Sequence, residues 1–355
     1  MKAFLDGTGE IVSLELRQRV RGVAVYVLLG IFVGLILIVT ILLTIALNGF
    51  GALNAGGAGI FSAIIYFVLL LGTLVAPALS GNAVNGDRDA GTLATTQITL
   101  VTTGQLIVGK FLAAWVLALA FLGAAVPFLV YAAIAGKLGA GTIVVSILVL
   151  ALELGVVAAV GVGLSAVIDR PLLSVVATYL VVAALSIGSL IAFTLGGLVV
   201  QTRTTVESNY PIEFNANNEV TTCSSDPPYT YQQPRFDYFW GFLATNPYVV
   251  MADAIPTTYD DTGNAIDLFG FVKVGVRTAQ IPPDQQAPQS MCVVGEVYDE
   301  SSYDYPTSKE TIDSTVPGWF VGLGLHLLLA AAALVFGWMR TRTPAGRLPR
   351  GSRIA

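Results

Sequence analysis

The chain contains 355 residues, of which 55% are hydrophobic and 12% are charged, whereas roughly a quarter of the residues in ordinary soluble domains are charged. A water-soluble fold cannot cover so much apolar surface, so the composition argues against a soluble globular protein and predicts an integral membrane protein. The net charge of −5 says little about partners, because the charged residues are distributed unevenly along the chain.

Six apolar stretches reach the length of about 20 residues that a membrane-spanning helix needs. We expect spans at about 23–47, 60–79, 111–135, 142–168, 172–200 and 316–339. The first stretch is much longer than the apolar core of a cleaved signal peptide, so we expect it to remain as an anchor.

Residues 10–21 precede the first span and mix apolar with charged side chains. Val12, Leu16 and Val20 recur every four residues, as one face of a helix lying in the membrane interface would require. The alternative is a basic anchor segment without a helix.

The basic residues indicate the orientation of the chain in the membrane. Twelve of the eighteen fall in segments on the side of the N-terminus, namely Lys2, Arg17, Arg19, Arg21, Arg88, Lys110, Arg170, Arg340, Arg342, Arg347, Arg350 and Arg353. The long loop 201–315 instead carries sixteen acidic and five basic residues, a net charge of −11. Because basic residues concentrate in cytoplasmic segments, we expect both termini in the cytoplasm and the loop outside the cell membrane.

The loop 201–315 is rich in aromatic residues, proline and asparagine, which predicts a small folded cap of irregular structure. Its two cysteines, Cys223 and Cys292, are the only ones in the chain, so no cysteine cluster for zinc or iron–sulfur is available. Thiols oxidise outside the cell, and we expect a Cys223–Cys292 disulfide; two unpaired buried thiols are the alternative. Residues 236–255 are apolar enough to turn back into the outer leaflet.

The predicted fold is therefore an all-α membrane protein with three parts. Residues 1–200 hold the N-terminal interfacial helix, spans one to five and a cytoplasmic loop at 81–110. Residues 201–315 form the extracytoplasmic cap, and residues 316–355 hold the sixth span and a basic cytoplasmic tail.

The cytoplasmic loop has a distinctive order of side chains. Two carboxylates flank an arginine, a Gly-Thr-Leu sequence follows, and Gly-Lys ends the loop; the candidate residues are Asp87, Arg88, Asp89, Gly91, Thr92 and Leu93. Its length suits one short helix that presents charge to a cytosolic partner. A solvated connector is the alternative.

The segment DRDAGTLATTQITLVTTGQLIVGK, at 87–110, resembles the loop between the second and third spans of ABC-2 type transporter permeases. Leu100 departs from that pattern, because proline is usual there. The sequences LELRQRVRG, NPYVVMADA and the basic tail resemble the same family. The resemblance covers the chain except about 201–235 and 256–315.

This resemblance implies a transport subunit of an ABC exporter that has no ATPase site, catalytic residue, cofactor or metal of its own. It implies a coupling helix at about 87–99 that docks on a cytosolic ABC ATPase subunit, in which ATP and Mg²⁺ bind. A second permease subunit would complete a homodimer or heterodimer within the membrane lipids, and no nucleic acid is expected. The family's path runs along the first, second and fifth spans, whose apolar character here suits an amphipathic or lipophilic cargo.

Residues 104–110 spell the first seven positions of a phosphate-binding loop, but Phe111 stands where the metal-binding Ser or Thr belongs. We therefore expect no nucleotide site there.

Glu153 and His326 are ionisable residues inside the fourth and sixth spans, at similar expected depths. Such residues are functional candidates by default. A structural hydrogen bond between them, or one from each to another neighbour, is nevertheless favoured over a proton relay, because these spans are peripheral in the family. The alternatives to an ABC permease are a secondary transporter, a membrane-embedded enzyme, and a membrane-anchored receptor or assembly protein that uses the cap.

Overall fold

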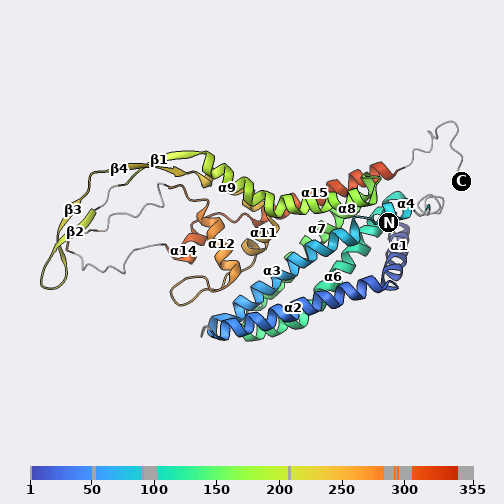
Figure 1. Cartoon of the computed structure of the whole chain (residues 1–355), viewed down its shortest axis with the longest axis horizontal. Coiled ribbons are helices and arrows are strands. Elements are labelled where there is room, and N and C mark those ends of the chain that lie inside the picture. The colour runs from blue at the N-terminus through green and yellow to red at the C-terminus, as the bar shows by residue number, and fades with distance from the viewer. Residues whose placement is uncertain are drawn as a thin grey trace.

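The structure is a computed structural model, and it describes residues 2–49, 53–89, 91, 102–206, 209–283, 292, 294–295 and 306–342. Within these residues, six helices are long and apolar enough to cross a membrane: Val23–Ala46, Gly57–Asp89, Thr103–Ala135, Ala140–Val167, Pro171–Val199 and Trp319–Thr341. The prediction of a multi-pass membrane protein is confirmed at this level. The molecule is elongated, with the helices gathered in one bundle and the strands projecting beyond it (Figure 1).

The chain begins with two helices, α1 (Lys2–Val20) and α2 (Val23–Gly49), which meet at a sharp turn. One face of α1 is buried against α6, through Thr8, Ile11 and Glu15. Gly109 on α6 allows this approach, because a side chain there would bring its Cβ within 2.6 Å of Ile11. The helix expected over 10–21 therefore exists and begins further upstream; its position in the membrane interface stays a prediction.

The centre of the bundle is formed by α3 (Leu53–Ser80), α6 (Thr103–Ala135) and α7 (Ala140–Val167). The last long helix, α15 (Trp319–Thr341), packs along α7. The two helices touch at Gly163, where a Cβ would lie 2.4 Å from the Ala333 carbonyl oxygen. Small residues permit such close contact between membrane helices, in which van der Waals packing replaces the hydrophobic effect as the driving force.

The third span begins at Thr103, eight residues before the start predicted at Phe111. Thr102 is its N-cap, and Thr102 and Gln105 form a reciprocal capping box that satisfies free backbone donors. Residues 104–110 consequently lie within a helix, in contrast to the loop that a phosphate-binding motif requires. A short helix, α4 (Asn85–Asp89), lies in the connection from α3.

The fifth span consists of α8 (Pro171–Ala183), the π-helical turn η1 (Ala184–Gly188) and α9 (Ser189–Val199). Pro171 suits the first turn of a helix, because a backbone N–H there has no intrahelical acceptor. The π-helical turn was not predicted. The fifth span and the first are the least buried of the six.

After α9 the chain forms four strands: β1 (Gln201–Val206), β2 (Asn209–Phe214), β3 (Val220–Ser225) and β4 (Tyr229–Pro234). They make two antiparallel ribbons, β1 with β4 and β2 with β3. The all-α prediction and the irregular cap were therefore wrong for this part. The threonine, valine and tyrosine residues of these segments favour extended backbone, which a reading based on proline and asparagine overlooked.

The predicted disulfide is confirmed: Cys223 on β3 is bonded to Cys292, with their Cα atoms 5.9 Å apart.

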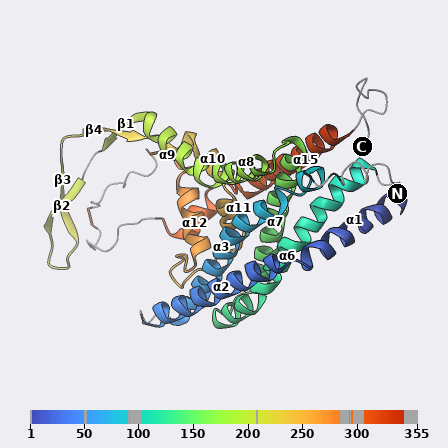
Figure 2. The same cartoon turned by 45° about the vertical axis from the view of Figure 1, so that its right-hand side comes forward.

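Among the described residues between β4 and the sixth span, the structure has the helices η2 (Phe236–Tyr238), α10 (Trp240–Ala244), α11 (Pro247–Ala254), α12 (Leu268–Thr278) and α14 (Ser308–Asp313). Helix α11 packs against α7, α15 and η1, so residues 236–255 turn back onto the spans (Figure 2). Entry of this hairpin into the outer leaflet stays a prediction.

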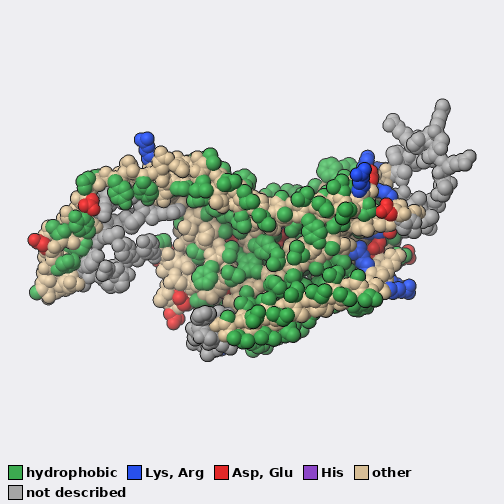
Figure 3. All heavy atoms as spheres, in the orientation of Figure 1, with side chains coloured by type: hydrophobic (Ala, Val, Ile, Leu, Met, Phe, Trp, Pro, Cys, Tyr) green, Lys and Arg blue, Asp and Glu red, His purple; other side chains and the backbone are tan. Residues whose placement is uncertain are grey.

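The N-terminus and the end of α15 lie at the same end of the bundle, since Gly104 of α6 is close to both Phe4 and Trp338. The strands lie at the opposite end (Figure 1). Charged side chains gather near the N-terminal end, whereas the middle of the visible surface is mainly hydrophobic (Figure 3). This arrangement puts the start of α1 and the end of α15 at one end of the bundle, and the position of the two termini in the cytoplasm stays a prediction.

Candidate functional site

A buried ionic cluster joins three helices at the N-terminal end of the bundle. Lys110 of α6 is only 1% exposed, and its Nζ forms ion pairs with Glu15 of α1 and with Asp87 of α4, the latter at 2.7 Å. Arg19 lies 3.5 Å from the same Glu15 carboxylate and donates a 2.7 Å hydrogen bond to the Leu79 carbonyl at the end of α3. Because a lysine is rarely buried without partners, this cluster fixes α1, α3 and α4 around the first two turns of the third span.

A second set of contacts joins α4 to the turn between α7 and α8. Arg88 donates hydrogen bonds to Asp169 at 2.8 Å and to the Asn85 side-chain oxygen at 2.9 Å. The Asn85 amide group in turn donates to the Ile168 carbonyl at 2.6 Å and to the Ser174 hydroxyl at 3.1 Å. The short helix α4 is therefore attached to the third, fourth and fifth spans.

The predicted coupling residues divide between these contacts and the surface. Asp87 and Arg88 point to different partners, and Asp89 is exposed. Gly91 has a φ of +68°, a left-handed conformation that glycine adopts without strain. Thr92, Leu93 and most of the expected coupling helix at 87–99 lie outside the described residues.

Sequence reasoning missed Glu15, Asn85 and Asp169 as members of this site. Glu15 was interpreted only as one of the charged residues of the segment 10–21, and Asp169 only as part of the polar break between the fourth and fifth predicted spans. The signal that could have revealed them is the position of Lys110, because a lysine at the start of a long apolar helix needs an acidic partner from a neighbouring segment.

Glu153 and His326 lie side by side in the bundle, as their positions in the fourth and sixth spans predicted. The two Glu153 oxygens are 2.9 Å and 3.0 Å from His326 Nδ1. The other ring nitrogen, Nε2, is 2.9 Å from the carbonyl oxygen of Thr245, which follows α10. Both side chains are buried.

Asn246 links the same turn to the fifth span. Its side-chain NH₂ donates to the Ser186 carbonyl at 2.6 Å and to the Ser189 hydroxyl at 2.9 Å, and its side-chain oxygen accepts from the Tyr248 N–H at 2.9 Å. A π-helical turn interrupts the regular hydrogen-bond ladder of a helix, and Asn246 supplies a donor to one of its carbonyl groups. The π-helical turn is thus held by a residue that also caps α11.

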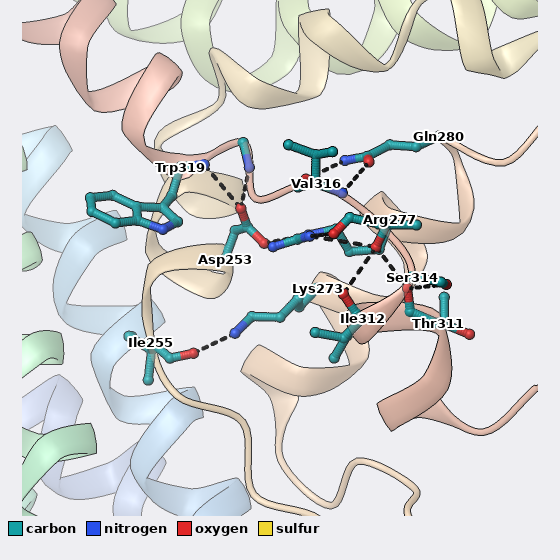
Figure 4. A network of polar contacts seen from close by, with 12 residues as sticks. Asp253, Ile255, Lys273, Arg277, Gln280, Thr311, Ile312, Ser314, Val316 and Trp319 are labelled. Atoms are coloured by element: carbon teal, nitrogen blue, oxygen red, sulfur yellow. Dashed lines mark hydrogen bonds and ion pairs between the residues drawn. The ribbon is translucent and has the colours of Figure 1, made fainter.

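A further buried network holds α11 and α12 on the start of α15 (Figure 4). Asp253 accepts a 2.8 Å bond from Arg277 Nε and bonds of 2.7 Å and 2.9 Å from the backbone N–H groups of Gly318 and Trp319. Arg277 also donates to the Thr315 carbonyl at 2.9 Å. A carboxylate at the first N–H groups of a helix stabilises it both as a cap and against the helix dipole.

Lys273 lies beside this network and donates a 2.6 Å hydrogen bond to the Ile255 carbonyl. Burial lowers the pKa of Lys273 below its ordinary value, and the nearby Asp253 carboxylate opposes that shift. These contacts hold α11, α12 and α15 to one another.

Among the residues that the structure describes, no three His, Cys, Asp or Glu side chains are placed so that they could hold a metal ion. A comparison of the chain with models of known protein families gives no match, and neither does a comparison with curated proteins. The functional argument consequently depends on the residues and contacts given above.

Proposed function

We propose that this chain is the membrane-spanning permease subunit of an ABC-2 type exporter, coupled to a separate cytosolic ATPase subunit. The observation that carries the proposal is the attachment of α4 to the bundle: the loop that resembles a coupling segment is fixed to the third span through Asp87–Lys110 and to the fourth and fifth spans through Arg88–Asp169.

This attachment suits the transmission of force. A displacement of α4 by a docked ATPase would move α6 and the α7–α8 turn together, because ion pairs and hydrogen bonds connect them directly. Coupling between distant sites needs such rigid elements with two arrangements. Asp89 is exposed on the same short helix and is available to the partner.

The path for cargo would lie between two permease subunits, along the weakly buried first and fifth spans. Their outward side chains are mainly leucine, isoleucine and valine, which favours a lipophilic or amphipathic cargo. The disulfide-bonded outer segment would stand at the end of the path opposite to α4 (Figure 1).

The test is co-purification of the full-length chain, tagged and expressed in its own host, with an ABC ATPase. Asp89→Lys reverses an exposed charge on α4 and leaves the internal ion pairs unchanged. Charge reversal at an interface weakens association strongly, so we expect at least about tenfold less ATPase to co-purify, equivalent to about 1.4 kcal/mol. Asp261→Lys, the same change at an exposed position of the outer end, should leave the amount of ATPase unchanged.

Purification of the wild-type chain without any ATPase, together with no nucleotide-dependent transport in vesicles from that host, would contradict the proposal. Equal ATPase recovery with both variants would contradict the role given to α4.

A further inference from the structure

His326 is the only histidine of the chain, and both of its ring nitrogens face oxygen atoms inside the bundle. The ring is 1% exposed, and the facing Glu153 is 2% exposed. At 1.5 Å per residue, Glu153 lies about 20 Å along α7 from its first residue, which is near the middle of the helix. Water therefore has little access to the pair.

The partner of Nε2 determines the tautomer. A backbone carbonyl oxygen can only accept a hydrogen bond, so the 2.9 Å contact with Thr245 requires a hydrogen on Nε2. The opposite nitrogen, Nδ1, is then free either to accept a hydrogen bond in a neutral ring or to donate one in a charged ring.

The partner of Nδ1 determines the number of protons. If neither Nδ1 nor the carboxyl group carried a proton, lone pairs would oppose each other at 2.9 Å and a negative charge would be buried without compensation. If both carried one, a positive charge would be buried without a compensating anion. With a single proton between them, the pair is neutral overall whether the proton resides on oxygen or on nitrogen.

We propose that Glu153 and His326 form a buried binding site for one proton, which they share, and that this site keeps the Nε2–H of His326 directed at the Thr245 carbonyl and so holds that carbonyl against the fourth and sixth spans. Glu153 and His326 are then positioning residues for the α10–α11 hairpin.

The packing of α15 supports this role. Gly322 lies one helical turn before His326, and a Cβ there would be 1.9 Å from the Ala244 carbonyl oxygen. The glycine thus lets the end of α10 come against α15, and the histidine on the same face binds the next carbonyl. Thr245 follows the last residue of α10, where carbonyl groups lack intrahelical donors. Asn246 anchors the following residue to the fifth span, so two consecutive residues connect the hairpin to three spans.

No other described ionisable side chain bonds to the pair. Those on the elements in extensive contact with α7 or α15 are Tyr66, Lys110, Tyr131, Tyr179, Tyr248, Asp253 and Arg340. The lysine is paired with carboxylates of α1 and α4, and the aspartate is paired with the guanidinium of α12. Among the described residues, the proton is therefore shared by these two ionisable groups alone.

The test uses the full chain, labelled with ¹⁵N histidine and purified in lipid nanodiscs, in which the single imidazole gives one pair of ring-nitrogen signals. We expect Nε2 to carry a hydrogen, with signals unchanged between about pH 5.5 and 8.5, whereas an ordinary histidine titrates near pH 6.5. A hydrogen on Nδ1 with bare Nε2, or titration near the ordinary value, would overturn the proposal.

Two variants of nearly equal volume separate the proton site from simple packing. Glu153→Gln keeps a donor to Nδ1, so we expect the same tautomer, a neutral ring at every pH and an unfolding temperature close to that of the wild type. Glu153→Leu leaves Nδ1 without a partner, and we expect the unfolding temperature to fall by roughly 3–8 °C. Equal unfolding temperatures for Gln and Leu would overturn the positioning role. Glu10→Gln, at an exposed position of α1, is the control and should match the wild type in both measurements. None of these measurements depends on transport or on an ATPase, so their outcome is independent of the proposed function.

Discussion

Replacing Asp253 by asparagine removes one charge from the buried network that joins α11, α12 and α15 and hardly alters the shape of the side chain. The carboxylate has two oxygens and both are used, one by Arg277 and the other by the backbone N–H groups of Gly318 and Trp319. Asparagine offers one oxygen and one NH₂ group. In either orientation of the amide, its NH₂ group faces another hydrogen-bond donor, either the Arg277 Nε–H or the backbone N–H groups of Gly318 and Trp319.

The expected loss follows from burial. The side chains of Asp253 and Arg277 are 2% and 5% exposed, so the arginine would keep an uncompensated charge away from water. Removal of one partner of a buried ion pair costs about 3–5 kcal/mol. If the chain unfolds cooperatively, this corresponds to a decrease in unfolding temperature on the order of 10 °C.

The assay is thermal unfolding of the full chain in detergent micelles, followed by tryptophan fluorescence. The matched control is Asp313→Asn, which breaks the Lys309–Asp313 ion pair of similar length, 2.7 Å. Both of these side chains are about 60% exposed. Water and salt screen such a pair, so we expect no resolvable change in the unfolding temperature.

A double variant tests the cause of the loss. With Arg277→Gln added to Asp253→Asn, the guanidinium charge left without its carboxylate is removed as well, and part of the lost stability should return. The reasoning is refuted if Asp253→Asn unfolds at the same temperature as Asp313→Asn. It is also refuted if adding Arg277→Gln lowers the unfolding temperature of Asp253→Asn further, by an amount as large as the first decrease.

Three further predictions concern the same part of the molecule. Gly322→Ala should lower the unfolding temperature, because overpacking against α10 destabilises the fold by about 1–3 kcal/mol. Gly324→Ala on the same helix should leave the unfolding temperature unchanged, because a Cβ at Gly324 would have no atom within 4 Å. Cys223→Ser with Cys292→Ser opens a bridge spanning 69 positions; loop-closure entropy assigns it about 4 kcal/mol, so limited proteolysis of the outer segment should accelerate. Hydrogen bonds from a neighbouring arginine hold the pKa of Asp237 below its ordinary value, so its stabilisation exists above that value and disappears as the pH falls through the lowered pKa. The wild type should therefore exceed Asp237→Asn in unfolding temperature at neutral pH, and the difference should shrink below about pH 4.

Each of these predictions has an outcome that contradicts it. Equal effects of alanine at the two glycines would mean that the bundle relaxes around α10. An unchanged rate of proteolysis without the disulfide would mean that interactions other than the Cys223–Cys292 bond stabilise the ribbons. A constant difference between wild type and Asp237→Asn across the acidic range would assign the interaction to packing instead of charge.

The parts of the fold that depend on hydrophobic length were predictable. A run of about 20 apolar residues has one stable solution in lipid, a helix, because every backbone group must be satisfied within the segment. The six spans follow from this rule. The pairing of the two cysteines was predictable for a different reason, because the chain has no other thiol that could compete. The juxtaposition of Glu153 with His326 was also foreseeable from their similar depths in two helices.

The parts that depend on contacts between distant segments were not predictable in the same way. The start of α6 was missed because Lys110 was interpreted as the end of the cytoplasmic loop, whereas ion pairs with α1 and α4 allow it to lie inside the helix. The strands at 201–234 have weak local signals and gain their order through pairing. The π-helical turn is accompanied by an asparagine more than fifty positions away, which no local pattern of residues 184–188 reveals.

The Cys223–Cys292 bond also has a mechanical consequence for the projecting ribbons. At one end, β4 leads into Arg235, whose N–H donates to the carbonyl groups of Gly197 and Val200 at the end of α9. At the other end, β3 is joined covalently to the chain that leads to α14 and the sixth span. A load applied to the ribbons is consequently shared between the fifth and the sixth spans. The ribbons therefore have two attachments, a direct one to α9 and a covalent one through the disulfide to the chain that precedes α14.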